Sequence, residues 1–180
     1  MISSAQLKDL ISEANQFDGN HGGITKNCED QDPAIGNRNS EIIMITAKAI
    51  WTEDERYVAD ATSRHAIVMD TAKEKTANTP IELVLIALCG CTASDVVGIL
   101  RKKREPFTSL EVSAEGERAE GYPAVYTEIK LTYRVGGKVS SKAMEDAVRL
   151  SKEKYCSVSA MLEKTAKITV AIEYLERVPS

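Results

Sequence analysis

Cys91 and Cys156 are the residues of this sequence whose types and spacing best suit chemistry. They lie 65 positions apart, and each falls in an apolar stretch, 81–100 and 155–162, that is typical of a helix. In such a pair, one thiolate can attack an oxidant and the second thiol can resolve the product as a disulfide. The pair therefore indicates redox chemistry.

Metal binding is the other chemistry that cysteines suggest. Cys89 and Cys91 form a C-x-C pair, but residues two apart on a helix are rotated by about 200° and point nearly opposite ways. His21 and His65, the only histidines, do not complete a zinc-binding pattern. The sequence therefore predicts no metal site. Cys89 is expected to be an inert buried thiol, and Cys28 an incidental exposed one.

A reactive Cys91 needs a cation close to its sulfur, because it lies too far into its helix to gain from the N-terminal dipole. Arg56, Arg64 and His65, from the preceding strand candidates, are the candidate cations. One helical turn after Cys91, Asp95 shares its face of the helix. The sequence does not choose among the three cations.

Composition predicts a cytosolic protein that binds neither nucleic acid nor membrane. The 180 residues carry a net charge of −4, and 43% are hydrophobic, which excludes a broad basic surface for nucleic acid. The N-terminus lacks the pattern of a signal peptide. The longest apolar run, residues 83–91, is too short to span a bilayer and is soon followed by Ser94 and Asp95. Cytosolic cysteines are usually reduced thiols.

The chain divides into an N-terminal extension, 1–40, and a domain, 41–180. The extension is expected to hold one short helix, 5–16, and an irregular segment, 17–40, rich in Gly, Asn and Asp. Alternating or apolar patterns then predict strands at 42–51, 56–62 and 65–69. Two strands with clear period-two patterns follow at 110–115 and 125–135, and a last one at 167–176. In the strand at 125–135, Val125 is expected to face inward with Ile129, Leu131, Tyr133 and Val135.

The helices complete an α+β domain with mostly antiparallel sheets. Pro80 opens a long helix that is apolar on nearly every face, as a buried central helix is. The basic run Arg101–Arg104 complements its C-terminus. Further helices are expected from Ser140 or Ser141 to about Tyr155, with Tyr155 on the same face as Met144 and Val148, and around 158–163. One small sheet cannot cover the long helix, so a second subunit is expected to help.

Two segments carry a resemblance to a known family. The segments TPIELVLIALCGCTASDVVGILRKKR and SKEKYCSVSAMLEK resemble the OsmC/Ohr family of osmotically inducible and organic-hydroperoxide-resistance proteins. The likeness is to the branch with a GCTA-DVV-IL-KKR helix and an EKYCSV segment, and it runs from about Ile42 to the C-terminus. It implies an OsmC-like fold in a tightly interwoven homodimer, with long central helices wrapped by sheets from both subunits and active sites at the dimer interface.

The resemblance also implies a peroxiredoxin-like activity in oxidative stress defence. Cys91 matches the attacking cysteine, which takes the terminal oxygen of an organic hydroperoxide and becomes a sulfenic acid. Cys156 matches the resolving cysteine, which condenses with it to a disulfide. A dithiol reductant of the lipoyl type then restores both thiols, and neither a metal nor an organic cofactor is needed.

The chain departs from the family pattern at two positions. Characterised peroxidases of the family have a glutamate directly after the helix-opening proline, where this chain has Ile81; Glu82 comes next and points away from Cys91. They also have an arginine some nine residues before the proline, a region occupied here by Asp70 and Thr71. These departures leave two alternatives open. One is an OsmC-like dimer that binds a small apolar ligand or partner, and the other is a redox sensor without efficient turnover.

Overall fold

The computed structural model describes residues 44–175, which form two units, one before Pro80 and one from Pro80 onward. Each unit is described by itself. The expected helix 5–16 and irregular segment 17–40 lie outside the described residues.

The first unit contains a three-stranded antiparallel sheet in the order β1-β2-β3. Its strands are β1 (Ala47–Glu53), β2 (Arg56–Ala61) and β3 (Ile67–Asp70), close to the three predicted strands. Asp54 turns the chain between β1 and β2 with a φ of 44°, a conformation that aspartate tolerates better than most residues. After β3, the buried Asp70 carboxylate accepts the backbone N–H of Ala72 and both the N–H and hydroxyl of Thr76, which fixes the loop that precedes Pro80.

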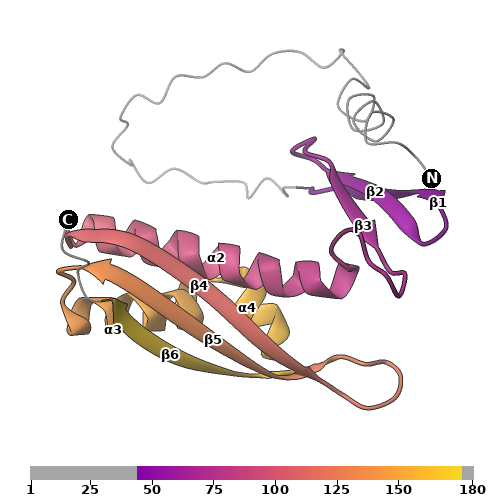
Figure 1. The fold of residues 1–180 in the computed structure, drawn as a ribbon. Helices are drawn as coiled ribbons and strands as arrows, with labels where there is room; N and C mark the ends of the chain where they lie inside the picture. Colours follow the sequence, from indigo (N-terminus) through magenta and orange to yellow (C-terminus); the bar gives the residue numbers. More distant parts are fainter. Residues whose placement is uncertain (1–43, 176–180) are drawn as a thin grey trace, which may run out of the picture. The chain divides into compact units, whose positions relative to one another are not determined.

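The second unit packs its helices on one face of a three-stranded sheet (Figure 1). In chain order it contains α2 (Pro80–Lys102), β4 (Phe107–Arg118), β5 (Tyr126–Gly137), α3 (Ser141–Leu150), the π-helix η1 (Ser151–Tyr155), α4 (Ser157–Leu162) and β6 (Lys167–Leu175). The sheet order is β4-β5-β6, with β4 antiparallel and β6 parallel to β5. The mixed, mostly antiparallel α+β architecture predicted from the sequence is confirmed.

The core of the second unit lies between β5 and the helices. Alternate residues of β5 are at most 2% exposed: Ile129, Leu131, Tyr133 and Val135. They meet one face of α2, formed by Leu88, Thr92, Val96 and Leu100. On the other face of the sheet, Arg134 forms ion pairs with Glu111 of β4 and Glu173 of β6, at 3.0 Å and 2.8 Å. The period-two pattern of β5 therefore separates core from solvent as the sequence predicts.

The start of β5 differs from the prediction. Val125, expected to face inward, is 39% exposed and lies just before the strand. A register shift in the β4–β5 pairing falls at Glu117/Arg118, and such a bulge moves the next side chain to the opposite face. Tyr126 takes the inward place instead, and its hydroxyl donates to the carbonyl of Ile81 at 3.0 Å. The strand thus ties the first turn of α2 to the sheet.

The predicted helix from Ser140 to Tyr155 is interrupted. Ser140 caps α3 as expected, accepting the N–H of Ala143, but after Leu150 the chain widens into η1, and the N–H of Cys156 donates to the carbonyl of Ser151 at 2.8 Å. A π-turn holds an extra residue and rotates the side chains that come after it in the chain. Tyr155, predicted to share the face of the buried Met144 and Val148, is 50% exposed, whereas Cys156 is 2% exposed. The irregularity is therefore what turns Cys156 toward the core.

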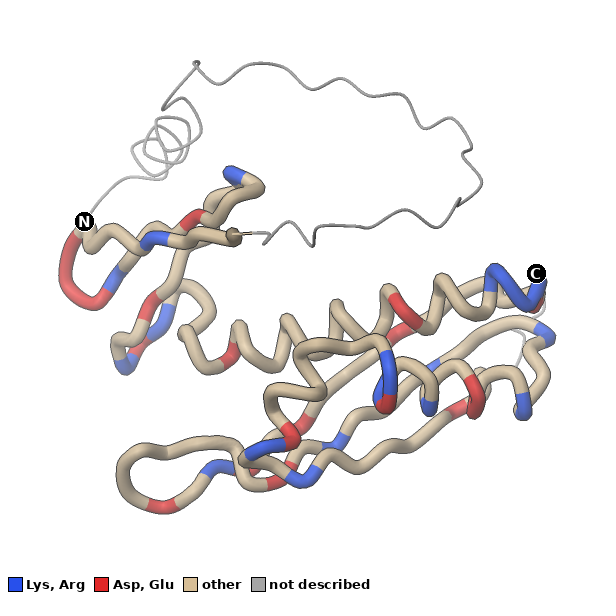
Figure 2. Tube along the Cα trace, turned by 180° about the vertical axis from the view of Figure 1, so that it is seen from behind, with Lys and Arg blue, Asp and Glu red and all other residues tan. Residues whose placement is uncertain are grey.

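Within residues 80–175, helix α2 is buried along only one side. Charged residues are sparse along its length and gather at its C-terminal end (Figure 2). An 18-residue window has a mean hydropathy of 2.2 and is 22% buried, so by length and composition the helix could cross a membrane, a property shared by core helices of soluble proteins. The apolar run 83–91, judged from the sequence to be too short to span a bilayer, is only part of this 23-residue helix. The expected burial of its other faces by a second subunit stays a prediction.

Candidate active site

The site is built where α2 passes the junction between η1 and α4. Cys91 and Asp95 project from the same face of α2, one turn apart. Cys156 occupies the N-cap position of α4, immediately after η1. The two sulfur atoms and a carboxylate oxygen of Asp95 all lie within 4.8 Å of one another. The structure thus brings together the two cysteines that the sequence singles out and adds an acid to them.

The Cys156 thiol is held in place and kept protonated. Its sulfur accepts the backbone N–H of Ser159 at 3.3 Å, as the cap of α4. Burial raises the pKa of the Cys156 thiol, the hydrogen bonds from Ser159 oppose this shift, and neighbouring Cys91 adds to it. A protonated, positioned thiol suits the partner that resolves an oxidised cysteine better than the one that attacks first.

A chain of hydrogen bonds leads from Asp95 into the core. The Ser151 hydroxyl donates to Oδ2 of Asp95 at 2.9 Å. Ser151 Oγ also lies 2.9 Å from Thr92 Oγ1, which in turn lies 2.6 Å from the hydroxyl of Tyr133. Burial raises the pKa of Tyr133 to about 12. Because a buried hydroxyl without a partner is costly, this chain fixes the orientation of the Asp95 carboxylate.

Sequence reasoning missed three residues of this hydrogen-bond network as site residues: Ser151, Thr92 and Tyr133. One signal could have found two of them: Ser151 and Thr92 are hydroxyl residues on otherwise apolar helix faces, and a buried hydroxyl needs a hydrogen-bond partner. The pairing of Ser151 with Asp95 depends on η1, which no sequence pattern predicts.

Cys89 and Glu82 lie apart from the pair. Burial raises the pKa of the half-buried Cys89 thiol, in keeping with the expected inert cysteine. Cys28 lies outside the described residues. Burial also raises the pKa of Tyr126, and the carboxylate of Glu82 near it adds to the shift. Glu82 therefore lies at the first turn of α2 beside Tyr126, about two and a half turns before Cys91.

The three candidate cations all belong to the first unit. Arg56 pairs with Glu53 at 2.7 Å and with Asp70 at 3.5 Å, so its charge is already partly matched there. Arg64 lies in a turn with a φ of 58°. The exposed His65 lines a pocket of about 410 Å³. The assignment of a cation to Cys91 stays a prediction.

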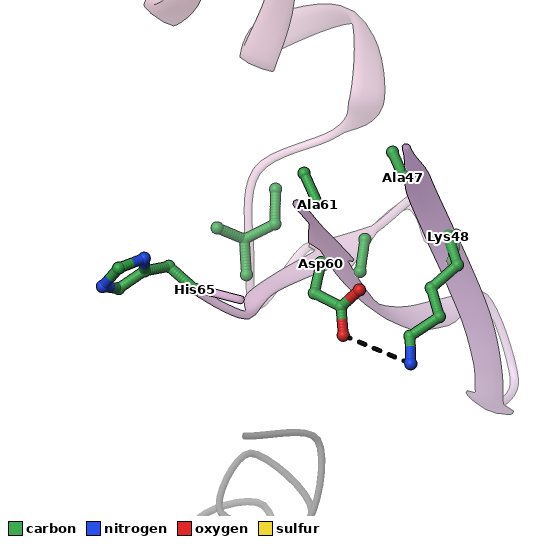
Figure 3. A pocket seen from close by; sticks show the side chains of 8 residues that line it. Ala47, Lys48, Asp60, Ala61 and His65 are labelled. Carbon is green, nitrogen blue, oxygen red and sulfur yellow. Dashed lines mark ion pairs between the residues drawn. The ribbon is translucent and has the colours of Figure 1, made fainter. Parts of the chain in front are cut away.

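The pocket beside His65 is a shallow groove on the sheet of the first unit. Lys48 and Asp60 form an ion pair at 3.4 Å across β1 and β2, and the His65 ring points away from them (Figure 3). Small side chains make up most of the rest: Ala47, Ala49, Ala59 and Ala61. Since the opposite charges of Lys48 and Asp60 match each other and the imidazole points elsewhere, the groove holds no cluster of reactive groups.

A second pocket, also of about 410 Å³, opens next to Asp95 in the second unit. Ile99, Leu150 and the exposed Tyr155 give it apolar walls, and Lys102 and Lys103 lie at the basic end of α2. Its lining also includes Ser94 and Gly98. Asp95 therefore belongs both to the cysteine cluster and to a pocket large enough for a small organic molecule.

Comparison with known proteins identifies the family. The profile of the family described as OsmC-like protein matches residues 71–171 of this chain. The chain belongs to the OsmC-like family. Protein YhfA of Escherichia coli strain K12 is 41% identical over 128 residues, which cover 71% of this chain and 96% of YhfA. The predicted resemblance to the OsmC/Ohr family is confirmed.

Solved structures share the fold. A hypothetical protein from Aquifex aeolicus VF5 matches with a TM-score of 0.66 and 31% identity, over 75% of this chain and 100% of that one. An organic hydroperoxide resistance protein OsmC from Legionella pneumophila matches with a TM-score of 0.58 and 14% identity, over 74% of this chain and 99% of that one. At 14% identity, the second of these likenesses shows a shared fold and no more.

Proposed function

We propose that this protein is a thiol-dependent peroxidase that reduces organic hydroperoxides through Cys91 and Cys156. One observation carries the proposal: two cysteines from distant parts of the sequence place their sulfur atoms within 4.8 Å of each other, beside a carboxylate. A disulfide between them needs only a modest approach of the two side chains. The family to which the chain belongs supports the same chemistry.

The proposed cycle has three steps. The Cys91 thiolate attacks the terminal oxygen of the hydroperoxide; the O–O bond breaks, an alcohol leaves with one proton, and Cys91 becomes a sulfenic acid. The Cys156 thiol then displaces the hydroxyl group, which leaves as water when the disulfide forms. A dithiol of the lipoyl type exchanges with that disulfide, regenerating both thiols as it is itself oxidised.

Asp95 is assigned the role of proton acceptor and donor in the first two steps. Its carboxylate lies within 4.8 Å of both sulfurs and is held by Ser151. In that position it accepts the proton that Cys91 loses on activation and gives it to the leaving alkoxide. It then accepts the proton of Cys156 and gives it to the hydroxide that leaves as water. The carboxylate thereby serves where this chain lacks the family's glutamate after the helix-opening proline.

The active form is proposed to be a cytosolic homodimer. Exposed apolar side chains support this: Ile86 on α2 is 51% exposed and Met161 on α4 is 65% exposed, and large exposed apolar surfaces usually mark interfaces. A second copy would cover the apolar side of α2 that residues 80–175 leave exposed.

The test is the consumption of cumene hydroperoxide and of hydrogen peroxide with dihydrolipoamide as reductant. Wild type is expected to consume the organic peroxide faster, and Cys91→Ser to fall to background. Cys156→Ser is expected to retain one turnover and to accumulate a sulfenic acid that dimedone traps at Cys91. Cys89→Ser is the matched control and is expected to keep the wild-type rate. Equal, near-background rates in wild type and Cys91→Ser, with no Cys91–Cys156 disulfide on peptide mapping, reject the proposal.

The pocket beside Asp95 favours a second candidate, a dimer that binds a small apolar ligand without turnover. Its apolar walls, Ile99, Leu150 and Tyr155, suit such a ligand. This function predicts saturable binding of the alcohol product, cumyl alcohol, with an affinity unaffected by Cys91→Ser but lowered by Ile99→Lys. Binding lost in Cys91→Ser argues for the peroxidase instead.

A further inference from the structure

We infer that the reduced cysteine pair and Asp95 form a binding site for a divalent cation of intermediate softness such as Zn²⁺. The site goes beyond the proposed peroxidase, which needs no metal. Its ligands are the sulfurs of Cys91 and Cys156 and one carboxylate oxygen of Asp95.

The ligand types and their spacing support this assignment. Two thiolates and a carboxylate are a donor set that Zn²⁺ accepts. The three donor atoms lie within 4.8 Å of one another, whereas donors around a tetrahedral zinc ion are separated by about 3.5–3.8 Å, given Zn–S and Zn–O bonds of about 2.3 Å and 2.1 Å. Each pair of donor atoms therefore needs to close by about 1.3 Å at most, which side-chain rotation supplies.

The C-x-C pair that the sequence suggested is not this site. Cys89 is two positions from Cys91 and lies on another face of α2. Asp95, one turn after Cys91, lies on the same face, and η1 delivers Cys156 from the other side. The ligand set is therefore Cys91, Asp95 and Cys156, in place of the Cys89 and Cys91 pair, whose sulfurs point to different sides of the helix.

Hydrogen bonds around the triad already resemble the outer shell of a metal site. The N–H of Ser159 donates to the Cys156 sulfur at 3.3 Å, which stabilises a bound thiolate. The hydroxyl of Ser151 donates to Oδ2 of Asp95 at 2.9 Å, which leaves the other carboxylate oxygen for an ion. Ligating groups held in this way lose less freedom on binding, and such partners commonly change metal affinity by about 10–100-fold.

Binding and redox chemistry then exclude each other. Zn²⁺ displaces two thiol protons and binds two thiolates and one carboxylate, which releases 2 H⁺ per ion. Metal-bound thiolates are not free to attack a hydroperoxide. Conversely, two-electron oxidation of the pair by a hydroperoxide or by diamide converts both sulfur ligands to a disulfide and expels the ion. The site therefore binds metal only when reduced.

The experiment uses reduced protein without peroxide, in a Cys28→Ser, Cys89→Ser background that retains Cys91 and Cys156 as its two cysteines. Co²⁺ serves as the spectroscopic probe, and Zn²⁺ competes it away. One Co²⁺ per chain is expected, with thiolate-to-metal charge-transfer bands in the near ultraviolet. Adding Cys91→Ser or Cys156→Ser should abolish those bands. Asp95→Asn should weaken binding by roughly 100-fold, and Ser151→Ala by roughly 10-fold.

The matched control is Asp146→Asn, an acid on α3 that pairs with Lys103 and Arg149 and should leave Co²⁺ binding unchanged. A measurement without ligand variants guards against misfolding: diamide should release the ion from the background protein, and a phosphine reductant should restore binding. No Co²⁺–thiolate bands, binding that survives loss of either cysteine, or binding indifferent to Asp95→Asn would overturn the site. The peroxidase is assayed separately with a chelator present, so either proposal can fail alone.

Discussion

The hydroxyl of Ser151 donates to the Asp95 carboxylate at 2.9 Å, although the two residues are 56 positions apart in the chain. Ser151 is fully buried at the start of η1, and Asp95 lies on α2 one turn after Cys91. Together with the 2.9 Å contact between Ser151 and Thr92, this bond joins the segment that carries Cys156 to the helix that carries Cys91. The geometry of the cysteine pair therefore depends on a serine that takes no part in redox chemistry.

Replacing this serine tests that dependence. Ser151→Ala removes the donor to Asp95 and a partner of Thr92, leaving buried polar groups unsatisfied. The free energy of unfolding is expected to fall by about 1–3 kcal/mol, measured by urea denaturation followed by circular dichroism. Ser157→Ala, at an exposed position of α4, is the control and should change stability by less than about 0.5 kcal/mol. Equal effects of the two substitutions would contradict the assigned role.

Asp95→Asn tests the proton acceptor, given the proposed peroxidase function. The amide keeps the size of the side chain and can still accept from Ser151, but it cannot take up a thiol proton. The rate of peroxide consumption is expected to fall by about 10²–10⁴-fold, while diamide still forms the Cys91–Cys156 disulfide. Glu145→Gln, exposed on α3, should keep the wild-type rate. An unchanged rate in Asp95→Asn would show that another group accepts the thiol proton.

The proposed homodimer predicts a mass of about twice the 19.7 kDa of the chain in light scattering. Ile86→Lys places a charge on the exposed apolar side of α2, where covering it by a second copy costs several kcal/mol. The variant is expected to dissociate to monomers at micromolar concentration. Glu128→Lys, on the outer face of the sheet, is the control and should remain dimeric. Monomeric wild type at that concentration would exclude a stable dimer.

The regular elements were predictable because their patterns are strong and local. Alternation in β5 predicted which of its residues are buried, and Pro80 and the basic run after Leu100 predicted the ends of α2. Val125 and Tyr155 were assigned to the wrong face. In both cases one inserted residue, in a β-bulge or a π-turn, shifts the register, and period-based reasoning assumes that no such insertion occurs.

The candidate site was predictable in part. The two cysteines stand out by type, and Asp95 by its place one turn after Cys91. The network of Ser151, Thr92 and Tyr133 was not predictable, because each bond joins elements whose contact depends on how η1 and β5 pack against α2. Periodicity gives the face on which a hydroxyl lies, but the partner that satisfies it is a property of the tertiary fold.

Tyr133 predicts a loss of stability at high pH. Burial raises its pKa to about 12, above the value of about 10 in an unfolded chain. Between pH 10 and 12 the unfolded state therefore loses the phenol proton first, so stability present below pH 10 declines as pH rises, by on the order of 2 kcal/mol. Tyr133→Phe should cost about 1 kcal/mol at pH 7 through the lost hydrogen bond to Thr92 but flatten this decline. Tyr122→Phe, at a fully exposed tyrosine, should leave the alkaline profile unchanged.

At Asp70, in the first unit, we expect a loss of stability at low pH instead. The Thr76 hydroxyl, followed by the N–H groups of Ala72 and Thr76, lowers the pKa of its carboxyl to about 2. Because this is below the unfolded value of about 3.9, the stability from the charged form is complete above pH 4 and is lost as pH falls toward 2. Fluorescence of Trp51, the only tryptophan, reports on the sheet that contains Asp70. Asp70→Asn should lower the stability of this sheet at pH 7 and remove its loss between pH 4 and 2, whereas Glu74→Gln, in the same loop and exposed, should do neither. An acid transition that persists unchanged in Asp70→Asn would show that other carboxyl groups unfold this sheet.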